Sequence, residues 1–598
     1  MKKTFAFMML FLGITIMGGI TACSDEEEKK QPEEVKPDTT STEKPDSLQP
    51  TPDPEPENKA AQGWPEQYGG IMLQGFYWDS YDDTQWSILQ AQADQLAGTF
   101  DLVWLPQSGN CGGMSMGYDD LYWFSNYNSS FGTEEQLRSL INTFRQNGIK
   151  TIADVVINHR KNLTNWVDFP KETYKGVTYE MLSTDIVAND DGGQTKTWAT
   201  QNGYQLSANN DSGEGWDGMR DLDHRSENVQ TIVKAYLDFL KNDLGYAGFR
   251  YDMVKGYSAS FTAMYNSSAQ PEFSVGECWD GTPTIRRWID GTKLNDQPQS
   301  AAFDFQFRYT VRNAMNNGNY QRLAQQNDGN WPLVSSSYEN GKYRRYAVTF
   351  VENHDTEKRS NAAQDPLKKD TLAANAYLLA MPGTPCVFLK HWQAYKQEIA
   401  NMVAVRKAVG IHNMSTPTQV ASNKEYYAVQ VAGSSEKELL CVVGTKAASY
   451  TPGSEWKMAI SGYHYAYYVK GIDPSAITLP ELKEEPEQQV EIPSFCTVAE
   501  GETCAFFEAP ATWTQTIMCW AWIDNGANFT GGTWPGTACT LLGTAANGNK
   551  VWKWTYNGNL TSQPQKIIFS NNGTPQTDDL IFENGGYYIK DGQRGKVN

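Results

Sequence analysis

The chain has 598 residues, which at about 150 residues per domain predicts roughly four domains. Its 50 basic and 70 acidic residues leave a formal net charge of −20. This charge excludes a nucleic-acid partner bound through clustered lysine and arginine, and it argues against adhesion to anionic lipid through a basic patch. Hydrophobic residues make up 39% of the chain, so a disordered or collagen-like structure is excluded for its bulk.

The first 23 residues have the pattern of an export signal. Two lysines precede Phe5–Ile20, a mostly apolar stretch of 16 residues without charge, which is shorter than the roughly 20 residues of a membrane span. The stretch runs into Ile-Thr-Ala-Cys at residues 20–23, which resembles a bacterial lipobox. The resemblance implies that Cys23 is lipidated and becomes the mature N-terminus. The alternative is an ordinary cleaved signal with an incidental cysteine.

An acidic, proline-rich segment follows the signal. Ser24–Glu28 is similar to the acidic tag of some surface-exposed Gram-negative lipoproteins. Residues 24–62 contain seven prolines, twelve acidic and five basic residues, so they cannot bury enough apolar surface to fold. We expect a disordered linker there, in a cell-envelope lipoprotein of the outer membrane that is exposed at the surface. Partner proteins of a surface uptake system would fit that location.

From residue 63 onward, short apolar or β-branched runs alternate with helical segments. One helix is predicted to start at the capping box Thr133-x-x-Gln136, and another carries apolar residues on one face from Val229 to Leu240. Strands that alternate with helices predict a parallel sheet, and eight of them predict an α/β fold closed as a (β/α)8 TIM barrel. The predicted strands are Ile71–Trp78, Leu102–Pro106, Thr151–Ile157, Ala247–Asp252, Phe273–Glu277, Ala301–Phe305, Ala347–Val351 and Cys386–Leu389.

The spacing of these runs predicts the domain organisation. More than 60 residues separate the third strand from the next helix, which is too long for a loop and predicts an inserted domain. Alternating strands such as Glu425–Val431 and Leu439–Val443 predict a C-terminal antiparallel β-domain. The expected boundaries are 63–404 for the barrel with its insertion at 160–224, 405–479 for the β-domain, 480–498 for a second linker and 499–598 for a terminal β-sandwich module.

The nine cysteines have no metal-binding spacing. Four are scattered singly, and Cys496, Cys504, Cys519 and Cys539 are clustered near the end of the chain. Export permits disulfides, so these four could form two, but the pairing cannot be read from the sequence. No CxxC motif occurs and the six histidines are dispersed, which argues against a zinc site.

Polar residues follow four of the predicted barrel strands, at the end where barrel enzymes carry their chemistry. In chain order they are Asp154, Asn158 and His159, then Arg250, Asp252, Lys255 and Gly256, then Glu277, and finally His354 and Asp355. Each has a structural explanation when taken alone; Arg250 and Asp252, for instance, share a strand face and could form a buried ion pair. Their joint occurrence at four strand ends favours an active site.

These segments resemble the signature regions of the α-amylase family of glycoside hydrolases, family 13, over roughly Gly63 to Val469. The resemblance implies that Asp252 is the nucleophile, that Glu277 is the general acid/base and that Asp355 is a third carboxylate that binds sugar hydroxyls. It implies substrate binding for Tyr118, His159, Arg250, Lys255 and His354.

The chemistry of these residue types supports the same roles. Retaining cleavage of a glycosidic bond needs two carboxyl groups about 5–5.5 Å apart, one ionised and one protonated. Arg250 favours the ionised form of Asp252, whereas nearby carboxylates should raise the pKa of Glu277 and keep it protonated.

The resemblance also implies a structural calcium ion that joins the inserted domain to the barrel. Its implied ligands are Asn158, Asp221 and the backbone carbonyl of Gly256, and hard oxygen ligands suit calcium. Loop capping without a metal is the alternative for the two side chains. The ligand from the insertion stays open among Asp185, Asp190, Asp191, Asp211 and Asp217.

The last hundred residues are similar to small β-sandwich starch-binding modules. Trp520 or Trp522, together with Trp534, would form a stacking platform, and Gln576 would hydrogen-bond glucose hydroxyls. Because one face of a sandwich sheet is core, some tryptophans must pack rather than bind, and we expect this of Trp552 and Trp554.

Together these patterns predict a retaining, endo-acting α-amylase that hydrolyses internal α-1,4-glucosidic bonds of starch and related α-glucans and is anchored to the envelope by lipid. A family enzyme that acts on cyclodextrin or pullulan, or that transglycosylates, is the alternative, since it would share every catalytic residue. A starch-binding lipoprotein with an inactive barrel is a third hypothesis, against which the intact carboxylates argue.

Overall fold

The structure is a computed structural model that describes residues 60–359, 364–482, 492–524, 526–545, 548–558, 562–590 and 592–597. The export signal, Cys23 and most of the expected linker over 24–62 lie outside the described residues. Ala61 is buried and its N–H donates to Gln299 Oε1, so the last residues of that expected linker instead pack on the barrel. Within the described ranges, no helix combines the length and apolarity that a membrane crossing requires.

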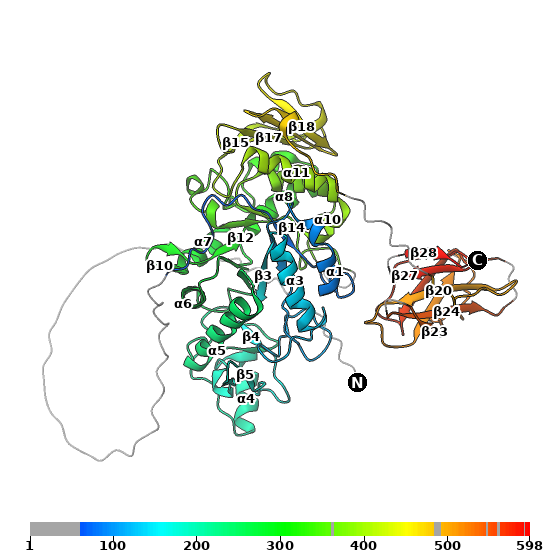
Figure 1. The fold of residues 1–598 in the computed structure, drawn as a ribbon. Coiled ribbons are helices and arrows are strands. Elements are labelled where there is room, and N and C mark those ends of the chain that lie inside the picture. The colour runs from blue at the N-terminus through cyan, green and yellow to red at the C-terminus, as the bar shows by residue number, and fades with distance from the viewer. Residues whose placement is uncertain are drawn as a thin grey trace, which may run out of the picture.

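Eight parallel strands form a closed barrel in the centre of the larger part of the molecule (Figure 1). The strands are β1 Met72–Gln74, β2 Leu102–Leu105, β3 Lys150–Val155, β8 Gly248–Tyr251, β9 Phe273–Gly276, β12 Ala301–Phe303, β13 Ala347–Thr349 and β14 Thr384–Phe388. Neighbours in the barrel are consecutive in this order, and β14 closes it against β1. The predicted (β/α)8 barrel and all eight of its strands are confirmed. The strands could be recognised in the sequence because parallel strands are buried on both faces and therefore read as apolar runs.

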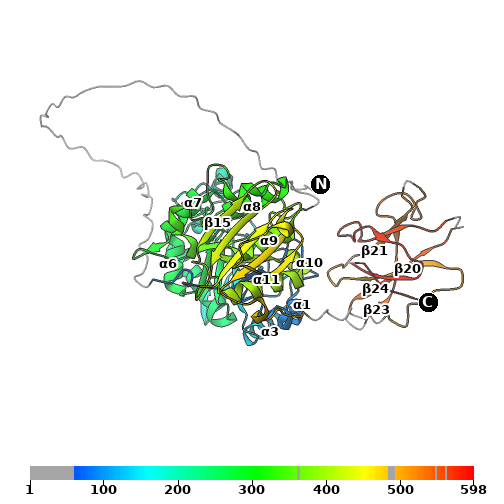
Figure 2. The same ribbon diagram turned by 90° about the horizontal axis from the view of Figure 1, so that it is seen from above.

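Helices surround the barrel when it is seen from above (Figure 2). They are α1 Trp86–Ala91, α2 Ala93–Leu96, α3 Glu134–Gln146, α5 Glu227–Asp238, α6 Ala259–Ala269, α7 Thr282–Gly291, α8 Phe305–Asn317, α9 Thr371–Ala380, α10 Leu389–Ala394 and α11 Lys396–Val409. The capping box predicted for α3 is present: the Thr133 side chain accepts from the Gln136 N–H, and the Gln136 side chain accepts from the Thr133 N–H. The predicted helix α5 continues into a π-helical turn, Phe239–Leu244.

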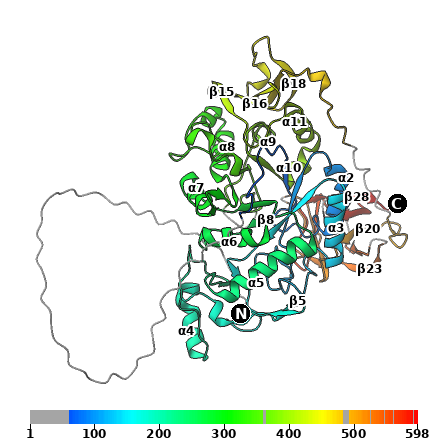
Figure 3. The ribbon, with the colours of Figure 1, turned by 60° about the vertical axis from the view of Figure 1, so that its left-hand side comes forward.

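The segment between β3 and β8 forms a small separate structure at one end of the barrel (Figure 3). It contains α4 Gln194–Gln201, the short hairpin of β5 Glu172–Tyr174 and β6 Val177–Tyr179, and an antiparallel pair of β4 His159–Arg160 and β7 Arg220–Asp221 at the two ends of the segment. So few regular elements cannot bury a large core alone, and polar contacts hold the segment in place.

The central polar contact of this inserted segment is a buried ion pair. Arg160 Nη2 lies 2.5 Å from Glu172 Oε1, and both side chains are almost fully buried. The Glu172 carboxylate also accepts from the backbone N–H groups of Trp123, Phe124 and Ser125. The pair therefore connects the insertion to the loop that follows β2.

An antiparallel sheet follows the barrel, as predicted. Its strands are β15 Pro417–Ser422, β16 Tyr427–Ala432, β17 Glu438–Val443, β18 Lys457–Gly462 and β19 Tyr465–Lys470, in the order β15-β16-β17-β19-β18. The expected boundary between residues 404 and 405 lies inside α11, which continues to Val409. The buried side chains of Val403, Val405 and Val409 extend its apolar face past that point.

The terminal module consists of two packed sheets. One has the order β23-β24-β20-β27-β28 and the other β22-β21-β25-β26. Their strands are β20 Thr503–Ala509, β21 Ile517–Trp522, β22 Thr537–Ala538, β23 Thr540–Thr544, β24 Lys550–Tyr556, β25 Lys566–Asn571, β26 Leu580–Ile581, β27 Gly586–Ile589 and β28 Gly592–Lys596. The module has two apolar clusters, a main core between the sheets and a smaller second cluster. Ile492, Cys496 and Val498 pack in the second cluster, so the end of the linker expected over 480–498 belongs to the module.

The eight cysteines among the described residues are all buried thiols. Cys519 and Cys539 belong to the main core of the module, whereas Cys496 and Cys504 belong to its second cluster. The structure therefore places two of the four terminal cysteines in each cluster and joins none of the four by a disulfide.

Candidate active site

The carboxyl ends of the barrel strands bring the three predicted carboxylates to one face. Asp252 directly follows β8, Glu277 directly follows β9, and Asp355 lies six residues after the end of β13. Asp252 and Glu277 are only 5% and 6% exposed. Parallel strands of a barrel end at the same face, which explains why residues so far apart in sequence converge.

One buried guanidinium connects these groups. Arg250 Nη1 lies 2.6 Å from Asp252 Oδ1 and 2.8 Å from Asp154 Oδ1, and Arg250 Nη2 lies 3.0 Å from Glu277 Oε1. Arg250 is paired in register with Asp154 across β3 and β8. Because the guanidinium is planar and rigid, its two Nη atoms hold Asp252 and Glu277 side by side. Asp154 was expected at this end of the third strand, but its ion pair with Arg250 was not predicted.

The electrostatics of the site separate the carboxyl groups. Burial raises the pKa of Glu277 well above its usual value; Arg250 opposes this, and the charges of Asp252 and Asp355 add to it. Burial alone would also raise the pKa of Asp355, but the adjacent His354 and the arginine charges leave it below its usual value. The pKa of Glu277 is thus shifted up and that of Asp355 down, and a carboxyl that keeps its proton more readily than its neighbour is suited to general acid catalysis.

Three nearly parallel rings lie beside the carboxylates. The Tyr118 ring is 2° from the plane of Trp78 and 9° from that of His354, with centroids 6.2 Å and 5.4 Å away. Tyr118 Oη lies 2.7 Å from His354 Nε2 and 3.0 Å from Asp154 Oδ2, which fixes its orientation. Flat aromatic faces and fixed polar groups are suited to a sugar ring. Trp78 was missed as a site residue, although it closes the first predicted strand.

Two other predicted substrate residues lie at the contact between the barrel and the insertion. His159 Nε2 is 2.9 Å from the Tyr118 carbonyl oxygen. Lys255 Nζ is 3.0 Å from Glu214 in the insertion and 3.1 Å from Asp280 in the loop after β9, so it ties the two sides of the rim together.

The sequence analysis also missed Trp279. It lies two residues after Glu277, is exposed, and stacks on Phe305 with centroids 5.1 Å apart. No sequence motif points to Trp279, and only its position two residues after Glu277 could have suggested a role.

The predicted calcium ligands lie together at the base of the insertion. Asn158 Nδ2 is 3.3 Å from Asp221 Oδ1, and a Cβ on Gly256 would lie 1.9 Å from Asn158 Oδ1, so only glycine fits there. The Asp211 carboxyl lies close enough to that of Asp221 for each to influence the pKa of the other, and Asp211 Oδ2 is buried without a hydrogen-bond partner. The geometry therefore favours Asp211 among the five acidic residues considered in the insertion.

The chemistry of this group fits a hard cation. Burial and the charges of neighbouring aspartates raise the pKa of Asp221 to about 8, and burial raises the pKa of Asp211 to about 6. Arg220, the nearest base, is engaged by Asp190 at 2.5 Å. The described residues contain no cluster of three His, Cys, Asp or Glu side chains suited to a metal, so amide and main-chain oxygens would have to complete the coordination.

The terminal module exposes the predicted aromatic residues on one sheet. Along β21, Ile517, Cys519 and Ala521 are buried while Trp520 and Trp522 face outward. The Trp520 and Trp534 rings lie 5.9 Å apart at 61°. Gln576 is exposed and pairs with Ser570 beside β25. Trp554 is buried in the core, as predicted, and Trp552 is partly buried against it.

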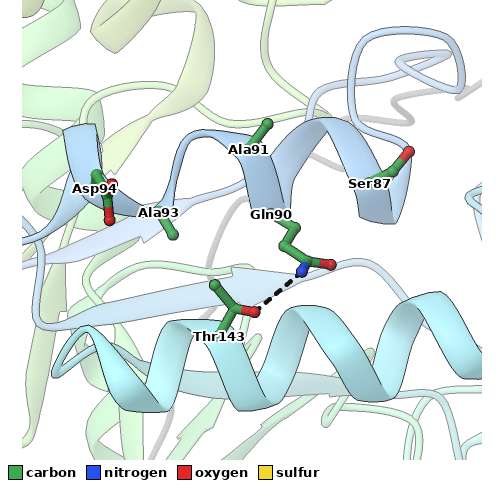
Figure 4. A pocket seen from close by; sticks show the side chains of 6 residues that line it. All are labelled: Ser87, Gln90, Ala91, Ala93, Asp94 and Thr143. Carbon is green, nitrogen blue, oxygen red and sulfur yellow. Dashed lines mark hydrogen bonds between the residues drawn. The ribbon is translucent and has the colours of Figure 1, made fainter.

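A hollow between the outer helices is unrelated to this site (Figure 4). It is lined by Ser87, Gln90, Ala91, Ala93, Asp94 and Thr143. Gln90 donates to Thr143 Oγ1 at 3.0 Å, which joins α1 to α3. A single carboxylate among small side chains offers no paired acid and base.

Comparisons with known proteins agree with this geometry. Residues 113–402 match the family described as alpha amylase, catalytic domain, and residues 505–582 match starch-binding module 26. The chain is 30% identical to "Probable alpha-amylase 2" of Arabidopsis thaliana over 423 residues, which are 67% of this chain and 94% of that one. It is 28% identical to a glucan 1,4-alpha-maltotetraohydrolase of Roseateles saccharophilus, covering 58% of this chain and 63% of that one. It is 27% identical to a cyclomaltodextrin glucanotransferase of Bacillus sp. (strain 17-1), covering 45% and 36%.

Proposed function

The chain belongs to the α-amylase family, and from this premise we propose that it is a retaining, endo-acting α-amylase that hydrolyses internal α-1,4-glucosidic bonds of starch and related α-glucans. The observation that carries the proposal is the contact of one guanidinium, Arg250, with both Asp252 and Glu277. This contact is compatible with the separation of about 5–5.5 Å between the two carboxyl groups of retaining enzymes.

In the first step, Asp252 attacks the anomeric carbon while Glu277 donates its proton to the glycosidic oxygen. The bond to the leaving chain breaks, and an ester forms between the sugar and Asp252. In the second step, the Glu277 carboxylate takes a proton from water, and the resulting hydroxyl attacks the anomeric carbon and releases Asp252. The raised pKa of Glu277 supports its role as the acid of the first step.

Calcium is part of the proposal as a structural ion. Asn158, Asp211, Asp221 and the main chain at Gly256 would hold it, and its charge would stabilise carboxylates that are otherwise buried together. In that position these residues would fix the insertion to the end of β3.

The envelope location is also part of the proposal. The lipobox-like residues 20–23 and the acidic Ser24–Glu28 support a lipid anchor at Cys23 in an outer membrane, with the enzyme exposed to the outside. A starch-binding module supports action on a polymer larger than the catalytic cleft. Incorporation of radiolabelled palmitate, lost in Cys23→Ser, tests the anchor.

Product analysis tests the activity. Amylose, pullulan and cyclodextrin are digested separately by the protein and by its Asp252→Asn variant. We expect amylose to fall rapidly to mixed maltooligosaccharides, and we expect no products from the variant. Attack mainly on pullulan or cyclodextrin, or transfer to an acceptor sugar, would retain the mechanism and change the substrate; the maltotetraohydrolase and glucanotransferase relatives make this the second candidate. Starch binding without turnover by either protein would refute an enzyme.

A further inference from the structure

The inserted segment carries a row of three aromatic rings away from the carboxylates. Trp166 and Trp198 have ring centroids 6.2 Å apart at 15°, and Trp198 and Tyr204 have centroids 5.8 Å apart at 15°. Trp198 belongs to α4, which lies at the end of the insertion that points away from the barrel strands in two views (Figures 1 and 3). We refer to these three residues as the aromatic row.

The rings of the row are nearly parallel but do not overlap fully. Rings in full face-to-face contact would have centroids about 3.5–4 Å apart, whereas neighbouring centroids in the row are 6.2 Å and 5.8 Å apart. The two outer rings of the row keep part of their surface exposed. Trp166 is 37% exposed and Tyr204 is 42% exposed, whereas Trp198 packs against the core with its remaining surface.

The backbone and side chains around the row hold it rigidly. The Arg220 guanidinium lies 5.2 Å from the centre of the Trp166 ring and is itself fixed by Asp190. The Tyr204 N–H donates to the Ala199 carbonyl at 2.8 Å, which sets the position of Tyr204 after α4. A ligand that meets such a surface loses little free energy to ordering it.

The chain around Trp198 and Tyr204 has little charge and is rich in hydrogen-bonding groups. Residues 194–210 contain a single charged side chain, Lys196, in a chain of which 20% is charged. Gln201 and Gln205 are exposed on either side of Tyr204. The guanidinium beside Trp166 is already paired with the Asp190 carboxylate, so the surface complements a neutral, hydroxyl-rich ligand.

The distribution of exposed tryptophans points to the same ligand. Of the 19 tryptophans, all within the described residues, three are exposed: Trp166, Trp279 and Trp534. Trp279 stands beside Glu277, and Trp534 stands in the starch-binding module. The other two exposed tryptophans are thus at sites where a glucan is expected.

We propose that the aromatic row is a third α-glucan-binding site, separate from both the active site and the terminal module. It would hold part of a polymer whose other segment lies in the cleft, by stacking sugar rings on Trp166 and Tyr204. The proposal rests on the α-glucan substrate proposed above, but it concerns binding and not turnover. A polymer held at two points is retained more strongly than at either one.

Binding is measured first with the full-length chain in an Asp252→Asn background, so that the ligand is not consumed. The probe is amylopectin, and the readout is retardation in affinity electrophoresis. The combined Trp166→Ala and Tyr204→Ala substitutions should weaken binding by roughly three- to tenfold for each ring. Trp166→Phe keeps an aromatic face over Arg220 and should retain most of the binding. Tyr463→Ala, which removes an exposed aromatic ring of the C-terminal sheet, is the matched control and should change nothing.

Turnover is then measured in chains with Asp252 intact. The kcat/KM for a maltotriose-sized substrate, too short to reach the row from the cleft, should stay within about twofold for all row variants, whereas amylopectin turnover should fall at low substrate concentration.

Several results would overturn the proposal. These are unchanged amylopectin binding, equal loss in Trp166→Phe, or equal loss in the Tyr463→Ala control. A change of oligomeric state in light scattering would make the row an interface between copies and would also overturn it. If the chain with Asp252 intact does not hydrolyse amylopectin but still binds it through the row, only the proposed hydrolytic function is refuted. Failure of this proposal and failure of the proposed function are therefore distinguishable.

Discussion

Replacing Glu277 with glutamine is the most direct test of the division of labour in the site. Glutamine keeps the size of the side chain, but its one amide oxygen can replace only one of the two carboxylate oxygens, of which Oε2 accepts from the Met253 N–H and Oε1 contacts Arg250. The substitution therefore removes the transferable proton and also leaves one of these two donors facing the amide NH2.

The size of the effect follows from the role. General acid catalysis contributes about 10²–10⁴-fold, which corresponds to roughly 3–5 kcal/mol of transition-state stabilisation. On amylose, whose leaving group is a poor one, we expect kcat/KM to fall by about this factor. On an aryl maltoside with an acidic phenol, which leaves without protonation, the loss in the first step should be far smaller. Asp252→Asn is the matched control and should lose activity on both substrates, because the nucleophile is needed in each.

The pH profile adds a second readout. Glu277 must be protonated to act, and its pKa is raised, so activity should be lost as pH rises through that pKa. This alkaline limb should disappear in Glu277→Gln. Equal losses on the two substrates, with the alkaline limb unchanged, would show that Glu277 is not the acid.

Three other perturbations test neighbouring parts of the structure. Asp355→Asn removes a charge that raises the pKa of Glu277, so the alkaline limb of kcat/KM should move to lower pH by about one unit; a shift to higher pH would contradict the electrostatic argument. Asp221→Asn should abolish the rise in thermal midpoint that calcium gives over EDTA in the parent chain, measured by differential scanning fluorimetry, and an undiminished rise would exclude this residue as a ligand. Glu172→Ala leaves Arg160 buried without its partner, so the free energy of unfolding in urea should fall by about 3–5 kcal/mol, and by less in Glu172→Gln. A fall of less than about 1 kcal/mol in Glu172→Ala would show that the pair does not hold the insertion.

The barrel could be predicted because its signal is local. Each strand is a short apolar run, and the polar residues that end the strands could be assigned to one face without knowing any distance. The same logic placed Asp252, Glu277 and Asp355 together. It also assigned Trp520 and Trp522 to one face of β21, since alternation has a period of two.

Features that depend on packing between distant segments could not be predicted. The shared contact of Arg250 with Asp154 depends on the register of β3 against β8, which composition does not encode. The continuation of α11 past Ala404 depends on buried valines that face the barrel and the following sheet. Likewise, Asp211 is distinguished from the other acidic residues of the insertion by its position beside Asp221 and by its buried Oδ2 without a partner.

The link made by Lys255 between Glu214 and Asp280 has a consequence for the width of the cleft. The lysine is about a quarter exposed, so its two ion pairs are open to screening by dissolved ions. At an ionic strength of 0.1 M, charges more than about 10 Å apart hardly interact, and at 1 M this distance falls to about 3 Å. Salt would therefore loosen the tie across the rim while leaving the buried Arg250 cluster intact. The distance between the insertion and the loop after β9 would then vary with the salinity of the surroundings.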